Sequence, residues 1–116
     1  MKKQGITLNA QAGAPSCDPF CPVHKAMDVL QGKWTLLILR DLLGGKKRFG
    51  KLRASLAGVS PRTLSARLRE LENSGIIKRT VFAEVPPRVE YELTAKGAGL
   101  GGVIRAMAKW GAKWRN

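Results

Sequence analysis

The 116-residue chain has few cysteines, no long apolar run and little negative charge. Its two cysteines, Cys17 and Cys21, are too few for the disulfide framework of a small secreted protein, so we expect both to be thiols in a reducing compartment. The longest apolar stretch, residues 34–43, is interrupted by Arg40 and Asp41 and falls short of the about 18–20 residues that span a bilayer. The first residues lack the apolar segment of a signal peptide. These absences predict a cytoplasmic protein without a membrane partner.

Positive charge is what the chain has in excess. Lys and Arg number 21 and Asp and Glu number 8, which gives a formal net charge of +13. A small body with such an excess is suited to polyanions, so we expect nucleic acid as the partner, ahead of an acidic membrane surface or an acidic protein. Residues 46–58 contain no acid and five basic residues: Lys46, Lys47, Arg48, Lys51 and Arg53.

Apolar periodicity and turn residues predict a mainly helical chain with a small β-hairpin. Residues 1–16 show no periodicity and are expected to form a flexible tail ahead of one domain over 17–116. Helices are expected from Pro22, over 34–43, 49–57 and 60–74, and from Thr94 onward, and strands over 76–82 and 88–93, with a further short strand before residue 49. This order is that of a winged helix, in which the two strands form the wing.

The helix expected over 60–74 has the clearest boundaries in the chain. Ser60 is a favourable N-cap, Pro61 suits the first helical position, and Gly75 suits the residue after the end. A turn at 58–60 separates this helix from the preceding one, which is the helix-turn-helix pattern. The second helix of that pattern is the one that enters the DNA major groove.

The exposed side of this helix supplies the candidate DNA contacts. When the leucine stripe from Leu64 to Leu71 faces the interior, Arg62 and Arg69 lie on the opposite side. Arginine offers guanine a planar pair of donors that lysine lacks, so these two are expected to read bases or clamp phosphates. Arg67 lies nearer the buried edge and is expected to pair with an acid or a phosphate. The remaining candidates on this helix are Ser60, Thr63, Ser65 and Ala66.

The basic block and the wing extend the expected contact with DNA. The basic block is expected to neutralise phosphates without reading sequence. Its candidate residues are Lys46, Lys47, Arg48 and Lys51. Arg88, beside the two prolines of the wing tip, is expected to enter an adjacent minor groove. Lys78 and Arg79, at the base of the wing, are further phosphate candidates.

The last helix carries an apolar stripe that continues to Trp114. Little of the same domain remains to cover it, so we expect a homodimer. Its two reading helices would match an inverted-repeat operator with half-sites about one DNA turn (~34 Å) apart. Glycines between Gly97 and Gly102 are expected to loosen the start of this helix. The expected interface residues are Val23, Met27, Ile104, Met107, Trp110 and Trp114.

Several short motifs occur in the order found in one regulator family. They are Cys21-Pro22-Val23, Gly32-Lys33-Trp34-Thr35-Leu36-Leu37-Ile38-Leu39, Arg48-Phe49, Arg67-Leu68-x-x-Leu71, Gly75-Ile76-Ile77, Pro87-x-Val89-x-Tyr91-x-Leu93-Thr94 and Lys96-Gly97. Over residues 20–114 the chain resembles the HxlR-type winged helix-turn-helix transcriptional regulators, which are related to the MarR type. The resemblance implies a dimeric DNA-binding regulator, usually of nearby genes and often responsive to electrophiles or oxidants.

Cys21 matches the position at which thiol-sensing members of that family resemble one another. The residues alone agree, because a helix N-terminus and the nearby Lys25 both favour the thiolate. Cys17 is a candidate resolving partner, and a disulfide between subunits is the alternative. A small buried cysteine with no redox role stays an open interpretation.

Other classes of protein fit the residues less well. A basic architectural or RNA-binding protein would bind all sequences with nearly equal affinity, whereas the bounded helix and the wing favour sequence reading. Cys17-x-x-x-Cys21 lacks the Cys-x-x-Cys spacing of dithiol enzymes, and no Ser/His/Asp set or phosphate-binding glycine loop is visible, so an enzyme is not expected. With His24, the cysteines provide at most three ligands, so neither a metal nor another cofactor is expected.

Overall fold

The computed structural model describes residues 21–114, and the expected tail and Cys17 lie outside the described residues. The chain forms two units, one ending at Leu30 and one beginning at Gln31, and each is described by itself. In the first unit, α1 covers Pro22–Leu30, with proline at its first position as predicted. The single domain expected over 17–116 stays a prediction.

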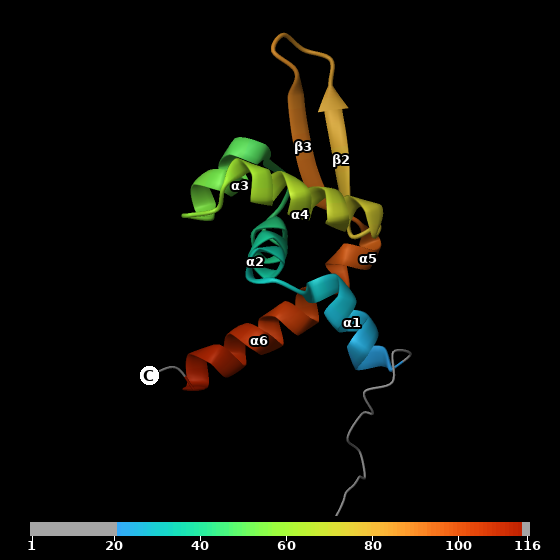
Figure 1. Cartoon of the computed structure of the whole chain (residues 1–116), viewed down its shortest axis with the longest axis vertical. Coiled ribbons are helices and arrows are strands. Elements are labelled where there is room, and N and C mark those ends of the chain that lie inside the picture. Colours follow the sequence, from blue (N-terminus) through green and yellow to red (C-terminus); the bar gives the residue numbers. More distant parts are fainter. Residues whose placement is uncertain (1–20, 115–116) are drawn as a thin grey trace, which may run out of the picture. The chain divides into compact units, whose positions relative to one another are not determined.

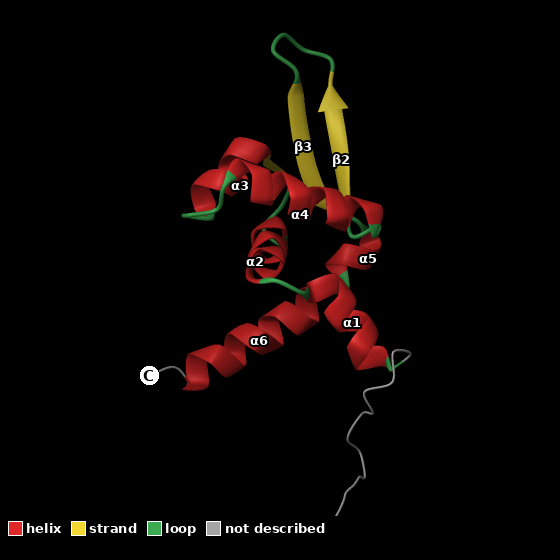
Figure 2. Cartoon of the chain, in the orientation of Figure 1, coloured by secondary structure: helices red, strands yellow, loops and turns green. Residues whose placement is uncertain are grey.

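The second unit alternates helices with a small sheet (Figures 1 and 2). In chain order it contains α2 (Lys33–Leu42), β1 (Lys47–Arg48), α3 (Phe49–Ser55), α4 (Pro61–Asn73), β2 (Ile77–Phe82), β3 (Arg88–Leu93), α5 (Ala95–Ala98) and α6 (Gly101–Trp114). Figure 1 shows the wing of β2 and β3 extending beyond α3 and α4, with α6 at the opposite end of this unit. The predicted winged-helix fold is confirmed. No helix within residues 21–114 has the length and apolar character needed to cross a bilayer.

The core of the second unit is built around α2. This helix buries Thr35, Ile38, Leu39 and Leu42 and contacts α3, α4, α6 and β3. A helix that is apolar nearly all round suits this place, because neighbours cover most of its circumference. The helices α3 and α4 and the turn between them add buried leucines: Leu52, Leu56, Leu64, Leu68 and Leu71.

The sheet attaches the basic block to the wing. Its strand order is β1-β3-β2, and both pairings are antiparallel. The wing pairs Ile77 with Leu93 at its base and Phe82 with Arg88 near its tip. The expected short strand is β1, which pairs Lys47 with Tyr91. Part of the basic block is therefore a strand of the same sheet as the wing.

The last helix differs from the prediction of one continuous helix. The structure has two helices, α5 and α6, separated at Gly99 and Leu100, where glycines lower the helix propensity. Thr94 caps α5 as predicted, because its Oγ1 accepts a hydrogen bond from the N–H of Gly97 at 3.1 Å. A Cβ at Gly97 would collide with the carbonyl oxygen of Ile76. Close packing therefore requires glycine there, which corrects the expectation that it merely loosens the helix.

Two further contacts fasten α5 to the end of α4. The hydroxyl of Thr94 has one hydrogen to donate, and its Oγ1 lies 2.6 Å from the carbonyl oxygen of Gly75 and 3.1 Å from that of Ile76. Lys96 Nζ donates to the carbonyl oxygen of Ser74 at 2.9 Å. The carbonyls that follow α4 are thus satisfied by residues at the start of α5.

Candidate nucleic-acid interface

The helix α4 begins where the sequence predicts. Ser60 is its N-cap, and the Oγ of Ser60 accepts a hydrogen bond from the N–H of Thr63 at 3.0 Å. The same oxygen donates to Thr63 Oγ1 at 2.9 Å. The sequence predicts both hydroxyls as DNA contacts, and in the structure both serve the cap. Their observed effect is to satisfy a free backbone donor in the first turn of α4.

The end of α4 is fixed by a Schellman motif. Gly75 N–H donates to the Glu72 carbonyl at 3.0 Å, and Ile76 N–H donates to the Leu71 carbonyl at 2.9 Å. Gly75 has a φ of +76°, which glycine adopts without steric penalty. With both ends capped and the leucine stripe buried, α4 presents one defined face to solvent.

The turn before α4 is longer than predicted. The helix α3 ends at Ser55, so residues 56–60 form the turn. Leu56 and Val59 are buried in it, and Gly58 has a φ of +93°. The sequence indicates only the Gly58 part of this turn, because the residues before it are compatible with another helical turn.

The exposed face of α4 carries two unneutralised arginines. Arg62 and Arg69 are exposed, and within residues 21–114 neither guanidinium has a hydrogen bond or ion pair. Ser65 and Ala66 lie on the same side and are also exposed. The arginine donors are thus available to a ligand outside the described chain.

Arg67 behaves differently from these two arginines. Its Nη1 lies 2.6 Å from Oε1 of Glu70, one turn further along α4. The sequence predicts an acid or a phosphate as the partner of Arg67, and in the structure the partner is an acid. A contact from Arg67 to DNA would first have to break or share this bond.

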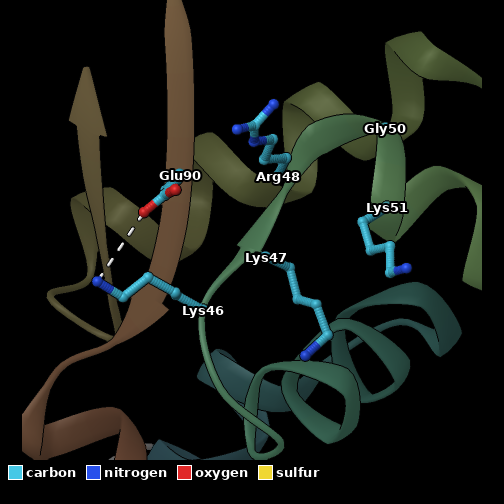
Figure 3. Close-up of a pocket in the computed structure, with 6 residues that line it drawn as sticks. All are labelled: Lys46, Lys47, Arg48, Gly50, Lys51 and Glu90. Carbon is cyan, nitrogen blue, oxygen red and sulfur yellow. Dashed lines mark ion pairs between the residues drawn. The ribbon is translucent and has the colours of Figure 1, made fainter. Parts of the chain in front are cut away.

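The basic block surrounds a hollow of about 590 Å³ (Figure 3), which is lined by Lys46, Lys47, Arg48, Gly50, Lys51 and Glu90. Lys46 Nζ lies 3.9 Å from Oε1 of Glu90, and Lys47 Nζ donates to a backbone carbonyl at 3.3 Å. Arg48 and Lys51 have no side-chain partner among residues 21–114. In Figure 3 the four cations extend in different directions and do not converge on one point. Such an arrangement spreads positive charge over a surface.

Arg88 is held inside the wing. Its guanidinium lies 4.1 Å from the ring centroid of Phe82. Its Nη2 is 3.3 Å from Oε2 of Glu84, and its Nε is 3.5 Å from Oε2 of Glu90. The side chain is only 28% exposed. The predicted entry into a minor groove would require these contacts to break, so that entry stays a prediction.

Glu90 is a residue of this surface that the sequence does not single out. It lies between two cations, Lys46 from the basic block and Arg88 from the wing. The alternation of residues along β3 already places Arg88 and Glu90 on one face. The contact with Lys46 has no such local signal, because it depends on the pairing of β1 with β3.

An apolar stripe covers the exposed face of α6. Val103, Met107, Trp110 and Trp114 recur at i, i+4, i+7 and i+11 and therefore share one side of the helix. All four are exposed, Trp110 to 67%. Ile104, also predicted at an interface, is half-buried. In the first unit, Val23 and Met27 on α1 are exposed as well. Contiguous exposed apolar side chains of this kind mark a surface for protein association.

Cys21 directly precedes α1. Its carbonyl oxygen accepts a hydrogen bond from Lys25 N–H at 3.0 Å, which starts the helix. Its thiol is free, and the residue is 9% exposed. His24 Nδ1 lies 3.9 Å from Asp28 Oδ1. Because Cys17 lies outside the described residues, the predicted pairing of the two thiols stays a prediction.

A capped helix after a helix-turn, a β-wing beside it and a strongly basic surface define a winged helix-turn-helix protein. The chain belongs to the HxlR-like helix-turn-helix family, whose sequence model matches residues 29–116. It is 46% identical over 111 residues to an uncharacterized HTH-type transcriptional regulator of Synechocystis sp.. The matched region covers 93% of this chain and 82% of that relative. The sequence resemblance to HxlR-type regulators is thereby confirmed.

Solved structures agree with this assignment. The redox regulator HypR in its reduced form matches with a TM-score of 0.79 and 40% identity, over 82% of this chain and 94% of that chain. A transcriptional regulator of the MarR family from Porphyromonas gingivalis matches with a TM-score of 0.83 and 39% identity, over 87% of this chain and 99% of that chain. The fold is therefore the MarR-like winged helix of transcriptional regulators.

Proposed function

We propose that this HxlR-type regulator is a homodimer that binds an inverted-repeat operator in double-stranded DNA and responds to oxidants through Cys21. The observation that carries the DNA part is the exposed face of α4, on which Arg62 and Arg69 have no partner within residues 21–114. A charged face without internal partners is suited to a polyanion that supplies them. The net charge of +13 has the same implication.

Base reading is assigned to the N-terminal part of α4. The major groove admits one α-helix, and the residues near its N-terminus reach the base edges. Arg62 is the second residue of α4, and its guanidinium can donate two parallel hydrogen bonds to O6 and N7 of guanine. Ala66, one turn later, has a side chain small enough for the helix to approach the bases closely.

The basic block is assigned to the DNA backbone. Its cations diverge around the hollow of Figure 3, which suits a series of phosphates better than one compact anion. Around this hollow, Arg48 and Lys51 have no side-chain partner among residues 21–114, whereas Lys46 and Lys47 have partners within the protein. These contacts would strengthen binding to all sequences and make it dependent on salt.

The apolar face of α6 is assigned to a second copy of the chain. Tryptophan and methionine are enriched in the centres of protein interfaces, where they bury large areas. A two-fold axis through this contact would present two copies of α4 to one side of a duplex. An inverted repeat has the same symmetry, which is why a palindromic operator is expected.

The oxidant response is assigned to Cys21, with Cys17 or a thiol of the second subunit as its partner. In such a step two thiols form one sulfur–sulfur bond and release two protons and two electrons, which an oxidant such as diamide accepts. The position of Cys21 before a helix N-terminus supports this assignment. So does the 40% identity to HypR, a redox regulator solved in reduced and oxidized forms.

A selection from random-sequence DNA duplexes tests the DNA part. The wild-type protein should enrich an inverted repeat, and Arg62→Ala should weaken binding to it by about 1–3 kcal/mol and relax the preferred sequence. Arg105→Ala, on α6, is the control, because it removes the same charge away from α4. Equal affinity for all duplexes, or stronger binding to RNA, would instead support a non-specific architectural or RNA-binding protein.

A second experiment tests the thiol. Diamide should change the affinity of the wild-type protein for the selected duplex, and Cys21→Ser should abolish this change without altering binding under reducing conditions. Cys17→Ser tells the two pairings apart: a disulfide-linked dimer that persists in this variant on non-reducing gels places the bond between two Cys21 thiols. If Cys21→Ser still responds to diamide, Cys21 is not the sensor.

A further inference from the structure

We propose that Arg69 and Arg79 together hold one backbone phosphate of DNA between α4 and the wing, so that base reading on α4 falls to Arg62 alone. This inference rests on the DNA binding proposed above and assigns one contact within it. It separates two arginines that the sequence alone treats as equivalent. It also assigns Arg79 to one particular phosphate, whereas the sequence indicates Arg79 only as a general phosphate candidate.

The site is a hollow of about 410 Å³ between a helix and a strand. Its lining residues are Ser65, Leu68, Arg69, Glu72, Arg79 and Tyr91. Ser65, Arg69 and Glu72 are spaced at i, i+4 and i+7 and therefore share one side of α4. Arg79 on β2 and Tyr91 on β3 are directly paired in the sheet, so their side chains lie on the same face. Helix and wing thus bring two arginines to one hollow.

The charges in this hollow favour a single anionic group. Among residues 21–114, neither the guanidinium of Arg69 nor that of Arg79 has a hydrogen bond or an ion pair. Glu72 supplies one negative charge against their two positive charges, so one positive charge remains in excess. A phosphodiester carries one negative charge and accepts charge-assisted hydrogen bonds from guanidinium groups. The hydroxyl of Ser65 is a further donor in the same lining.

The position along α4 favours a phosphate over a base. Arg62 lies in the first turn, where a reading helix reaches the base edges. Arg69 lies two turns later, beside β2, where the wing would meet the DNA backbone that borders the groove. Arg62 is therefore expected at a base edge on the floor of the groove, and Arg69 at the DNA backbone beside the wing. The two arginines therefore contact different parts of the duplex.

Neutral phosphate analogues test this assignment directly. Methylphosphonate groups are placed one at a time in the duplex selected by the wild-type protein. We expect one position in each half-site at which the neutral group weakens wild-type binding about tenfold. At that position the Arg69→Gln/Arg79→Gln double variant should be insensitive, because it no longer holds the phosphate.

Matched variants complete the experiment. Arg69→Gln should weaken binding by a factor that is the same for every duplex, and so should Arg79→Gln. Both variants should leave the preferred sequence unchanged, whereas Arg62→Gln should change the preferred sequence. Arg105→Gln, on α6, is the charge-matched control, because it removes the same charge away from this hollow; it should retain the wild-type methylphosphonate pattern. Glu72→Gln should tighten binding several-fold, since it removes the negative charge from the hollow.

The outcomes separate this inference from the function on which it rests. If Arg69→Gln shifts the preferred sequence as Arg62→Gln does, Arg69 reads a base and the inference is wrong. A double variant that stays sensitive at every methylphosphonate position also overturns it. If the wild-type protein selects no duplex at all, the proposed function itself fails. All these positions are exposed, and circular dichroism of each variant establishes that its fold is intact.

Discussion

The helices α4 and α6 are similar in length and opposite in chemistry. Pro61–Asn73 turns its leucines inward and exposes unpaired arginines, whereas Gly101–Trp114 turns its tryptophans and methionine outward. The apolar face of α4 is stabilised by its own subunit. The apolar face of α6 has no such cover within residues 21–114. Because the exposed side of a helix has to suit its partner, we expect a polyanion as the partner of α4 and another apolar surface as the partner of α6.

The largest expected effect is on the free energy of unfolding, which should depend on the buried stripe of α4 much more than on the exposed stripe of α6. Leu68 is 1% exposed, so Leu68→Ala leaves a cavity and should lower the free energy of unfolding by about 2–5 kcal/mol. Val103→Ala on α6 should lower it by less than about 1 kcal/mol in the dissociated protein. Urea denaturation at low protein concentration measures both. Equal losses would mean that the stripe of α6 is packed within its own subunit.

The next effect concerns association rather than folding. Trp110 is an exposed aromatic residue in the middle of the α6 stripe, so Trp110→Ala should weaken dimerisation by about 2 kcal/mol or more, which is at least about 30-fold. Sedimentation equilibrium measures this change. Lys109→Ala, the neighbouring position on another side of α6, should leave the dissociation constant unchanged. A Trp110→Ala protein that dimerises like the wild type would remove α6 from the interface.

The smallest effect concerns the basic block. Lys51→Ala should weaken binding to specific and random duplexes alike. It should also lower the slope of log affinity against log salt by about 0.9 for each phosphate that is no longer neutralised. Lys47→Ala should have a smaller effect, because Lys47 Nζ already donates to the carbonyl of Gly45. Titrations at several salt concentrations distinguish the two. An effect of Lys51→Ala on one sequence only would contradict its assignment to the backbone.

Much of α4 could be predicted because its signals are local. Ser60, Pro61 and Gly75 lie within one turn of the helix ends that they define, and the Arg67–Glu70 pair is three residues apart. The buried leucines follow from the helical period alone. Boundaries and faces of this kind depend on few residues, so the sequence is sufficient to predict them.

Features that depend on distant pairing could not be predicted in the same way. The short strand before residue 49 is predicted, but its pairing of Lys47 with Tyr91, far along the chain, is not. The closeness of Gly97 to the carbonyl of Ile76 follows from how α5 packs beside the start of β2. Arg88 is engaged by a ring and two carboxylates that the fold brings together around it. Sequence periodicity predicts on which face of a helix or strand a residue lies, but it does not predict which residues of other elements that face contacts.

The contacts between the end of α4 and the start of α5 have a mechanical consequence. Thr94 and Lys96 bind the carbonyls of Ser74, Gly75 and Ile76, and Gly97 leaves no space between the two segments. We therefore expect the C-terminal end of α4 to follow any displacement of α5. Beyond this joint, Gly99 and Leu100 separate α5 from α6, and α6 also contacts α2. We therefore expect a movement of α6 to reach α4 by two routes, through α5 and through α2, which also contacts α4.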